Sequence, residues 1–202
     1  MTTCTLTRQR VAGRLIDTDP DLLVVTGLGG TCWDASRAGD RDLTYYLWGG
    51  MGLAASTGLG LALSRPDRRI LVLTGDGEVL MGLGSLATVA RAAPGNLAIV
   101  VVDNELYGET GGQASHTAGN CDLAGIARAA GIADSRTVSD VAELETLASA
   151  VGALGTAVQG PLFAVARVPG QLSGPPAELP PRDGTYLKHR FREALIGPHI
   201  LR

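Results

Sequence analysis

The most informative stretch of this chain is residues 74–117, TGDGEVLMGLGSLATVARAAPGNLAIVVVDNELYGETGGQASHT. The apolar run 70–74 predicts a buried strand that ends at Gly75-Asp76-Gly77. A helix over 79–92 and a second strand over 97–102 complete a βαβ unit. Parallel strands place their carboxyl ends at the same sheet edge, where open α/β sheets bind ligands. We therefore expect Asp76 and Asn104 to lie close together.

The residue types at this edge indicate a magnesium and phosphate site. A carboxylate such as Asp76 and an amide oxygen such as Asn104 are hard ligands, which suit Mg²⁺ together with phosphate oxygens and water. Gly75 and Gly77 on either side of Asp76 allow the backbone to approach a phosphate closely.

This combination resembles the thiamine diphosphate-binding motif, in which GDG is followed at a similar distance by a pair of asparagines. The first residue of that pair is Asp103 here, whereas the second, Asn104, is intact. The resemblance implies that Mg²⁺ is bound by Asp76, the Asn104 side chain and the backbone carbonyl of Leu106. It also implies cofactor contacts from the residues around these ligands: Gly75, Gly77, Glu78 and Tyr107.

Two further glycine-rich segments add to the expected cofactor site. Gly27-Leu28-Gly29 follows an apolar strand, in the position of a loop that helps to hold the diphosphate in thiamine diphosphate enzymes. Gly49-Gly50-Met51-Gly52 resembles the GSMG or GSIG turn of the decarboxylases of this family. The resemblance implies that Met51 supports the bent cofactor and that the Gly49 carbonyl accepts a hydrogen bond from its amino group.

The loop after Asn104 is long, polar and rich in glycine, which is typical of functional loops. Its YGETGGQ segment resembles the corresponding segment of sulfopyruvate and phosphonopyruvate decarboxylases, which faces the substrate. The loop contains no arginine, so a positive charge for an anionic substrate is expected from a partner chain. Glu109 is either a proton relay or a solvated carboxylate, and His116 is a second catalytic candidate. The expected substrate-binding residues are Thr110, Gly111, Gly112 and Gln113.

Composition indicates a globular chain of 202 residues, with 45% hydrophobic and 18% charged residues. The net charge of −3 does not favour nucleic acid or an acidic membrane surface. No stretch has the roughly 18 apolar residues of a membrane-spanning helix, and no signal peptide is visible. The three cysteines, Cys4, Cys32 and Cys121, are expected to be free thiols in the cytoplasm. Cys32, in its glycine-rich loop, is either a reactive thiol or, as we favour, a buried filler.

The remaining pattern predicts an α/β fold, a doubly wound and mostly parallel sheet with helices on both faces. Residues 33–44 are polar and predict irregular structure. Gly52, Ser56 and Gly60 recur every four residues and predict a helix with a smooth stripe of small residues, which ends at Pro66 and Asp67. We expect a cofactor-binding domain over 1–170, followed by a proline-rich extension and a terminal helix over 171–202. The apolar face of that helix could pack on this chain or on a neighbour: Tyr186, Leu187, Phe191, Leu195 and Ile196.

The resemblance covers residues 20–170 and corresponds to half of an active site. In the family, a glutamate that activates the cofactor lies on a separate pyrimidine-binding domain, and too few residues precede the first strand here to form one. We favour a β subunit that needs an α subunit, in an α2β2 or larger complex, and that decarboxylates a 2-oxo acid. A carboligase or lyase subunit, and a non-catalytic cofactor-binding chain, remain the alternatives.

Overall fold

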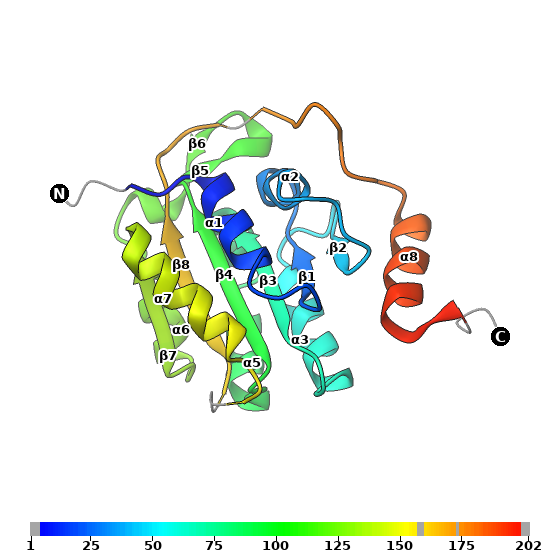
Figure 1. Cartoon of the computed structure of the whole chain (residues 1–202). Coiled ribbons are helices and arrows are strands. Elements are labelled where there is room, and N and C mark those ends of the chain that lie inside the picture. Colours follow the sequence, from blue (N-terminus) through cyan, green and yellow to red (C-terminus); the bar gives the residue numbers. More distant parts are fainter. Residues whose placement is uncertain (1–4, 157–159, 173, 199–202) are drawn as a thin grey trace.

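A parallel six-stranded sheet forms the centre of the molecule in the computed structural model, which describes residues 5–156, 160–172 and 174–198 (Figure 1). Its strand order is β2-β1-β3-β4-β8-β7, and every neighbouring pair is parallel. The two central strands are the strands expected from the apolar runs before Asp76 and Asn104. The strand bounds are β1 Leu23–Thr26, β2 Thr44–Tyr46, β3 Ile70–Gly75, β4 Leu97–Asp103, β7 Asp134–Val138 and β8 Leu162–Arg167.

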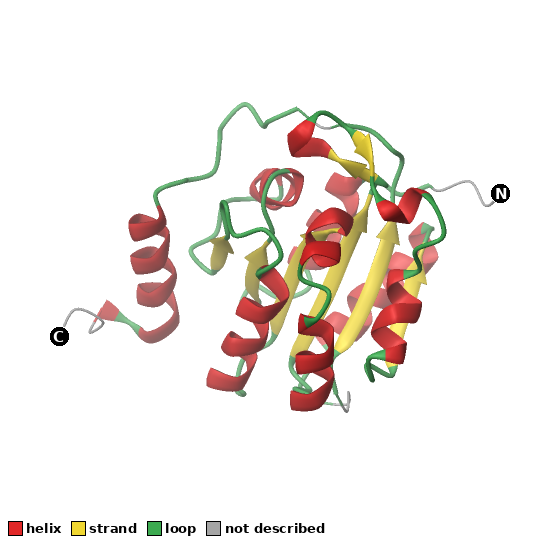
Figure 2. Cartoon of the chain, turned by 180° about the vertical axis from the view of Figure 1, so that it is seen from behind, coloured by secondary structure: helices red, strands yellow, loops and turns green. Residues whose placement is uncertain are grey.

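Helices cover both faces of this sheet (Figures 1 and 2). Alternate residues of each strand belong to opposite apolar clusters, so Val24 and Leu71 pack on one face while Val25 and Val72 pack on the other. The first face is covered by α1 (Arg8–Ile16), α2 (Gly30–Arg37) and α7 (Val141–Gly152). The second is covered by α3 (Ala54–Ser64), α4 (Asp76–Met81), α5 (Ser85–Ala92) and α6 (Leu123–Ala129). The doubly wound α/β fold is therefore confirmed.

The strand order reverses between β1 and β3, because the chain leaves β1 toward β2 and leaves β3 toward β4. Such a reversal opens a crevice at the carboxyl ends of the two strands, where doubly wound folds bind their ligands. The loops that begin at Gly27 and Gly75 both start at this crevice. The topology alone thus places two of the expected site segments side by side.

The segment 33–44 is more regular than the sequence indicates, and this expectation was wrong. It contains most of α2 and the start of β2. The helix begins after Gly29, which has no side chain to cap it, so the usual start signal is missing. β2 has three residues at the edge of the sheet, too few to show an alternating pattern.

The helix expected over 79–92 is in fact two helices, α4 and α5, separated at Gly82 and its neighbours. The cause is a close contact between Gly82 and the turn that carries Met51. A Cβ atom at Gly82 would lie 2.1 Å from the backbone oxygen of Gly52. The break therefore lets two loops of the site touch through their backbones.

Gly82→Ala is expected to destabilise the protein by about 1–3 kcal/mol, since its methyl group would push the Gly52 backbone away. Gly84→Ala is the matched control, because a Cβ there meets open space at an ordinary backbone angle. Its effect should stay within about 1 kcal/mol. Urea unfolding of both variants measures the difference, and equal midpoints would show that the Gly82 contact is not restrictive.

The end of the chain returns to the sheet (Figure 1). After β8, the extension passes over the carboxyl ends of the strands to α8 (Gly184–Ile196), which packs beside β2. Leu187 and Phe191 are buried there, whereas Tyr186 and Ile196 are about half exposed. The terminal helix thus packs on this chain, with part of its expected apolar face exposed. In the described part of the chain, no helix is long and apolar enough to cross a membrane.

Candidate active site

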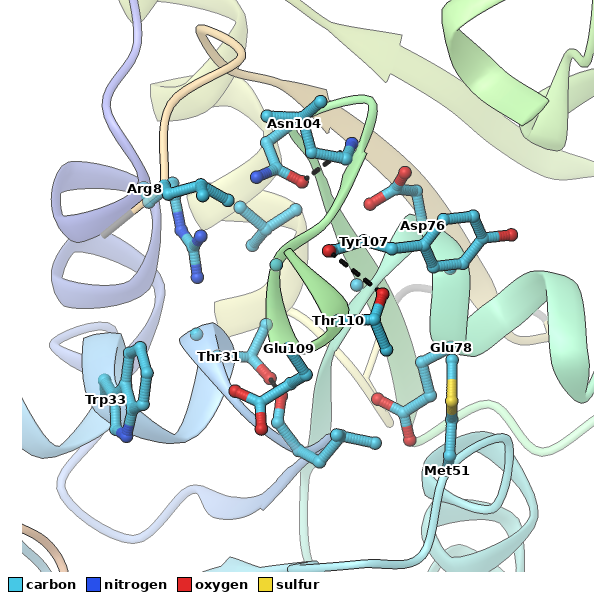
Figure 3. A pocket seen from close by; sticks show the side chains of 18 of the residues that line it. Arg8, Thr31, Trp33, Met51, Asp76, Glu78, Asn104, Tyr107, Glu109 and Thr110 are labelled. Carbon is cyan, nitrogen blue, oxygen red and sulfur yellow. Dashed lines mark hydrogen bonds between the residues drawn. The ribbon is translucent and has the colours of Figure 1, made fainter. Parts of the chain in front are cut away.

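A cavity of about 340 Å³ lies at the carboxyl ends of β3 and β4 (Figure 3). It lies under the loop after β4, which contains the short hairpin of β5 (Leu106–Tyr107) and β6 (Gln113–Ala114). Most of the side chains expected at the site meet in this one cavity. The expected residues that line it are Leu28, Met51, Gly75, Asp76, Gly77, Glu78, Asn104, Leu106, Tyr107, Glu109 and Thr110.

Asp76 is the first residue of α4, and only 2% of its surface is exposed. Its Oδ2 atom accepts hydrogen bonds from the hydroxyls of Ser115 and Thr117, the latter at 3.2 Å. Both of these contacts are on Oδ2. Burial raises the pKa of the Asp76 carboxyl, opposed mainly by the Ser115 hydrogen bond. A bound cation would favour the charged form again.

Asp103 takes part in the same network. The Thr117 hydroxyl lies 2.7 Å from Asp103 Oδ1, which also accepts from the Glu105 N–H group at 3.1 Å. A hydroxyl has one proton, so Thr117 donates to Asp76 or to Asp103 at any time. The residue that departs from the asparagine pair therefore helps to position Asp76 and the turn after β4.

Asn104 and Leu106 flank Glu105, whose φ of 61° lies in the left-handed region. The Asn104 Oδ1 atom accepts from the Leu106 N–H group at 3.3 Å, and its Nδ2 donates to the Gln171 carbonyl at 3.3 Å. This tight turn brings both residues to the cavity. The left-handed conformation costs free energy for a residue other than glycine, and backbone strain of this kind is common at functional sites.

The glycines after β1 make room for charged side chains. A Cβ at Gly27 would lie 1.6 Å from the Glu78 carboxylate, and one at Gly29 would lie 2.7 Å from the Glu109 carboxylate. A Cβ at Gly30 would lie 1.5 Å from the Arg8 guanidinium. Each glycine thus leaves room for a charged side chain that is remote in sequence.

Glu78 is buried between these loops, with 5% of its surface exposed. Its Oε2 accepts from the Thr74 hydroxyl at 2.8 Å, while Oε1 has no hydrogen-bond partner among the described residues. Burial raises the pKa of this carboxyl, and the Thr74 hydroxyl and the backbone N–H groups of Ala54, Leu28 and Gly52 oppose the rise.

Several expected residues lie outside the cavity lining. The Gln113 amide donates to the Thr110 carbonyl at 2.8 Å, and its oxygen accepts from the Thr110 hydroxyl at 2.7 Å. His116 is exposed, and its Nδ1 lies 3.2 Å from the Tyr107 hydroxyl. Their roles stay predictions, as do those of the expected glycines outside the lining: Gly27, Gly29, Gly49, Gly50, Gly111 and Gly112.

Sequence reasoning missed other residues of the site. Ser115 and Thr117 lie in the loop that was expected to be functional, so their polarity was the available signal. Arg8 lies on α1, before the first strand, and no local pattern distinguishes it. The further lining residues are Gly30, Thr31, Trp33, Val102, Gly108, Leu172 and Gly174.

Cys32 lies in α2 rather than in a loop, and it is buried. Its Sγ donates to the Gly27 carbonyl at 2.7 Å and contacts the Thr26 hydroxyl at 3.1 Å. Burial raises the pKa of the Cys32 thiol to about 12, so it is neutral at physiological pH. The structure therefore supports a packing role. Cys121 is half-buried and free, and Cys4 lies outside the described residues.

Comparison with known proteins identifies the family. Residues 29–164 match the model of the thiamine pyrophosphate enzyme, C-terminal TPP binding domain. The chain belongs to this family. The match begins at the end of the loop after β1 and includes the Met51 turn, the ends of β3 and β4 and the hairpin, and it makes thiamine diphosphate the cofactor of this domain.

Relatives of this thiamine pyrophosphate-binding domain are named decarboxylases. This chain is 38% identical over 190 residues to the sulfopyruvate decarboxylase subunit beta of Methanothermobacter thermautotrophicus, and the match covers 94% of this chain and 93% of that subunit. It is 41% identical over 179 residues to the phosphonopyruvate decarboxylase of Streptomyces viridochromogenes, covering 88% of this chain but 43% of that one. The crystal structure of benzoylformate decarboxylase from Polynucleobacter necessarius has a similar fold, with a TM-score of 0.69 at 21% identity over 85% of this chain and 35% of that chain.

The residues present fit thiamine diphosphate and magnesium. Asp76, with a carboxylate, and Asn104, with an amide, line one cavity together with Leu106. A Cβ atom at Gly77 would lie 2.4 Å from the Tyr107 ring, which leaves no room for a side chain there. The backbone of Gly77 therefore borders the cavity directly. Among the described residues, no group of three or more His, Cys, Asp or Glu side chains could hold a metal ion. The mixed carboxylate, amide and carbonyl set is thus the candidate magnesium site.

Proposed function

We propose that this chain is the diphosphate-binding subunit of a decarboxylase that acts on a 3-substituted pyruvate with an anionic substituent, sulfopyruvate first and phosphonopyruvate second. The products are CO2 and an aldehyde. The observation that carries the proposal is the cavity that unites Asp76, Asn104 and the hairpin loop. The names of the relatives support the substrate class, and both named substrates carry a second anionic group on the pyruvate skeleton.

In this proposal, Asp76 Oδ1, the Asn104 amide oxygen and the Leu106 carbonyl hold Mg²⁺. The N–H groups of Gly77 and Glu78 belong to the first turn of α4, have no partner within that helix, and suit a diphosphate. The bound cofactor supplies a cationic ring that accepts the electrons released with CO2. The protein binds and orients both molecules and excludes water from them.

The rest of the cavity fits these tasks. Met51 lies opposite the hairpin and supports the cofactor, and Leu28, Val102 and Leu172 contribute apolar surface that excludes water. We assign the proton relay to Glu109, whose carboxylate lies over Gly29 at the cavity. Thr110, on the same loop, also lines the cavity and is the one expected substrate-binding residue within its lining.

A second chain is part of the proposal, since relatives that match along nearly their full length are named subunits. It would supply the glutamate that activates the cofactor, in an α2β2 or larger complex. Leu53 and Met81, which are 55% and 67% exposed, are the chain neighbours of Gly52 and Gly82, which contact each other, and they offer apolar surface to the second chain. We place the complex in the cytoplasm, because the free thiols Cys32 and Cys121 suit a reducing compartment.

The substrate proposal predicts strong discrimination by the complex of this chain with its partner. Sulfopyruvate should exceed pyruvate in kcat/KM by at least about 100-fold, since a site built for an anionic group leaves its donors unpaired with pyruvate. Phosphonopyruvate should rank second. The measurement is kcat/KM for the three acids on the co-purified complex. If pyruvate or a branched-chain 2-oxo acid were the best substrate, the hairpin loop would have been misinterpreted.

A further inference from the structure

Arg8 reaches the cavity from α1, a helix that the site otherwise does not use (Figure 3). Its side chain is 12% exposed. The Nε atom donates to Asp34 Oδ2 at 2.9 Å. This contact engages one edge of the guanidinium and leaves its two terminal nitrogens without a hydrogen-bond partner among the described residues. Arg8 is therefore a fixed cation with free donors at the cavity.

The surroundings hold this side chain in place. Asp34 is fully buried on α2 and also pairs with Arg37 at 3.3 Å. Gly30 provides the space, because any Cβ there would overlap a terminal nitrogen of Arg8. A buried carboxylate behind the guanidinium and a glycine beneath it fix one orientation. The conformational entropy lost on ligand binding is correspondingly small.

The charges of the cavity favour an anion at Arg8. The other ionisable residues along its lining in the described ranges are the acids Asp76, Glu78 and Glu109, and the tyrosine Tyr107. Asp76 belongs to the proposed metal site, and Glu78 accepts a hydrogen bond from the Thr74 hydroxyl. Arg8 is thus the single cation that the described lining offers. Its free nitrogens form a fork that matches two oxygens of one acidic group.

Figure 3 also separates Arg8 from the cofactor groups. Arg8 lies with Thr31 and Trp33 on one side of the loop that carries Glu109, whereas Asp76, Glu78 and Met51 lie on the other side. Metal and diphosphate belong to the Asp76 side. The Arg8 side is left for the substrate.

We propose that Arg8 binds the anionic third-carbon substituent of the substrate, a sulfonate or phosphonate, and so determines specificity. This rests on the proposed function above. It replaces the expectation that the positive charge comes from the partner chain, since α1 supplies it. Asp34 acts as a positioning residue for Arg8.

The test uses the cofactor-loaded complex with Arg8→Gln and Arg8→Lys, and with Arg10→Gln as the matched control. Arg10 is exposed on the same helix and lies outside the cavity lining, so the control loses the same charge. The first readout is the Kd of 3-sulfopropanoate, which lacks the reacting ketone. The others are kcat/KM for sulfopyruvate and for pyruvate, and the Kd of thiamine diphosphate.

Arg8→Gln should weaken 3-sulfopropanoate binding and lower kcat/KM for sulfopyruvate by about 10- to 100-fold, as expected for hydrogen bonds to a charged group. Pyruvate turnover and cofactor affinity should change by less than about threefold, within the ordinary spread of a neutral substitution. Arg8→Lys keeps the charge beside Asp34, so its losses in 3-sulfopropanoate affinity and in kcat/KM for sulfopyruvate should be smaller. If Arg8→Gln fails to fold, the losses in Arg8→Lys test the proposal. Arg10→Gln should match the unmodified complex.

Two results would overturn the proposal. Unchanged 3-sulfopropanoate affinity in both Arg8 variants would show that Arg8 does not bind the substituent. Equal losses for sulfopyruvate and pyruvate, with weaker thiamine diphosphate binding, would assign Arg8 to the diphosphate instead. If the unmodified complex did not turn over sulfopyruvate, the proposed function would fail. The 3-sulfopropanoate comparison would still decide whether Arg8 binds such anions.

Discussion

Asp76→Ala is expected to weaken Mg²⁺-dependent binding of thiamine diphosphate at least about tenfold, or about 1.4 kcal/mol. The substitution removes the charged ligand of the proposed metal site. It also leaves the negative charge of the diphosphate poorly balanced, because the metal ion is held less tightly. Calorimetry on the complex, with and without Mg²⁺, measures the change.

Ser115→Ala is the matched control for this experiment. It removes one hydrogen bond to Asp76 Oδ2 and keeps the carboxylate and its Oδ1 atom. Its effect on cofactor affinity should therefore be clearly smaller. Burial and the nearby Asp103 carboxylate both disfavour the charged form of Asp76 in the free protein, so Asp76→Ala should fold normally. Unchanged cofactor affinity in Asp76→Ala would show that the metal assignment is wrong.

The sheet was largely predictable because its central strands are long, apolar and buried on both faces. Residues 70–74 and 97–102 have no competing interpretation, and each ends in residues that stop a strand. By contrast, α2 starts without a side-chain cap, and the break at Gly82 depends on a backbone contact with Gly52. Contacts of this kind between distant segments leave no local pattern in the sequence.

The site divides in the same way. Asp76 and Asn104 could be found because the motif fixes them at two strand ends, and parallel topology then brings them together. Arg8 could not be found, since its place at the cavity depends on how α1 packs against α2 and on the room above Gly30. The glycines after β1 were expected to approach a phosphate. In the structure they accommodate Glu78, Glu109 and Arg8.

The largest expected effect concerns the second chain. This chain holds a candidate metal site and a cofactor cavity, whereas in our proposal the activating glutamate comes from the partner chain. Losing a positioned acid–base group typically costs 10²- to 10⁴-fold in rate. We therefore expect the isolated chain to decarboxylate sulfopyruvate at least about a thousandfold more slowly than the complex.

The most direct test of this account is to titrate the separately purified partner into this chain and record CO2 release from sulfopyruvate. Thiamine diphosphate and Mg²⁺ are kept saturating. The account predicts negligible turnover by either chain alone and a rate that rises until the two chains are present in equal amounts. Full turnover by this chain alone would contradict it, because the cavity would then be a complete active site rather than one half.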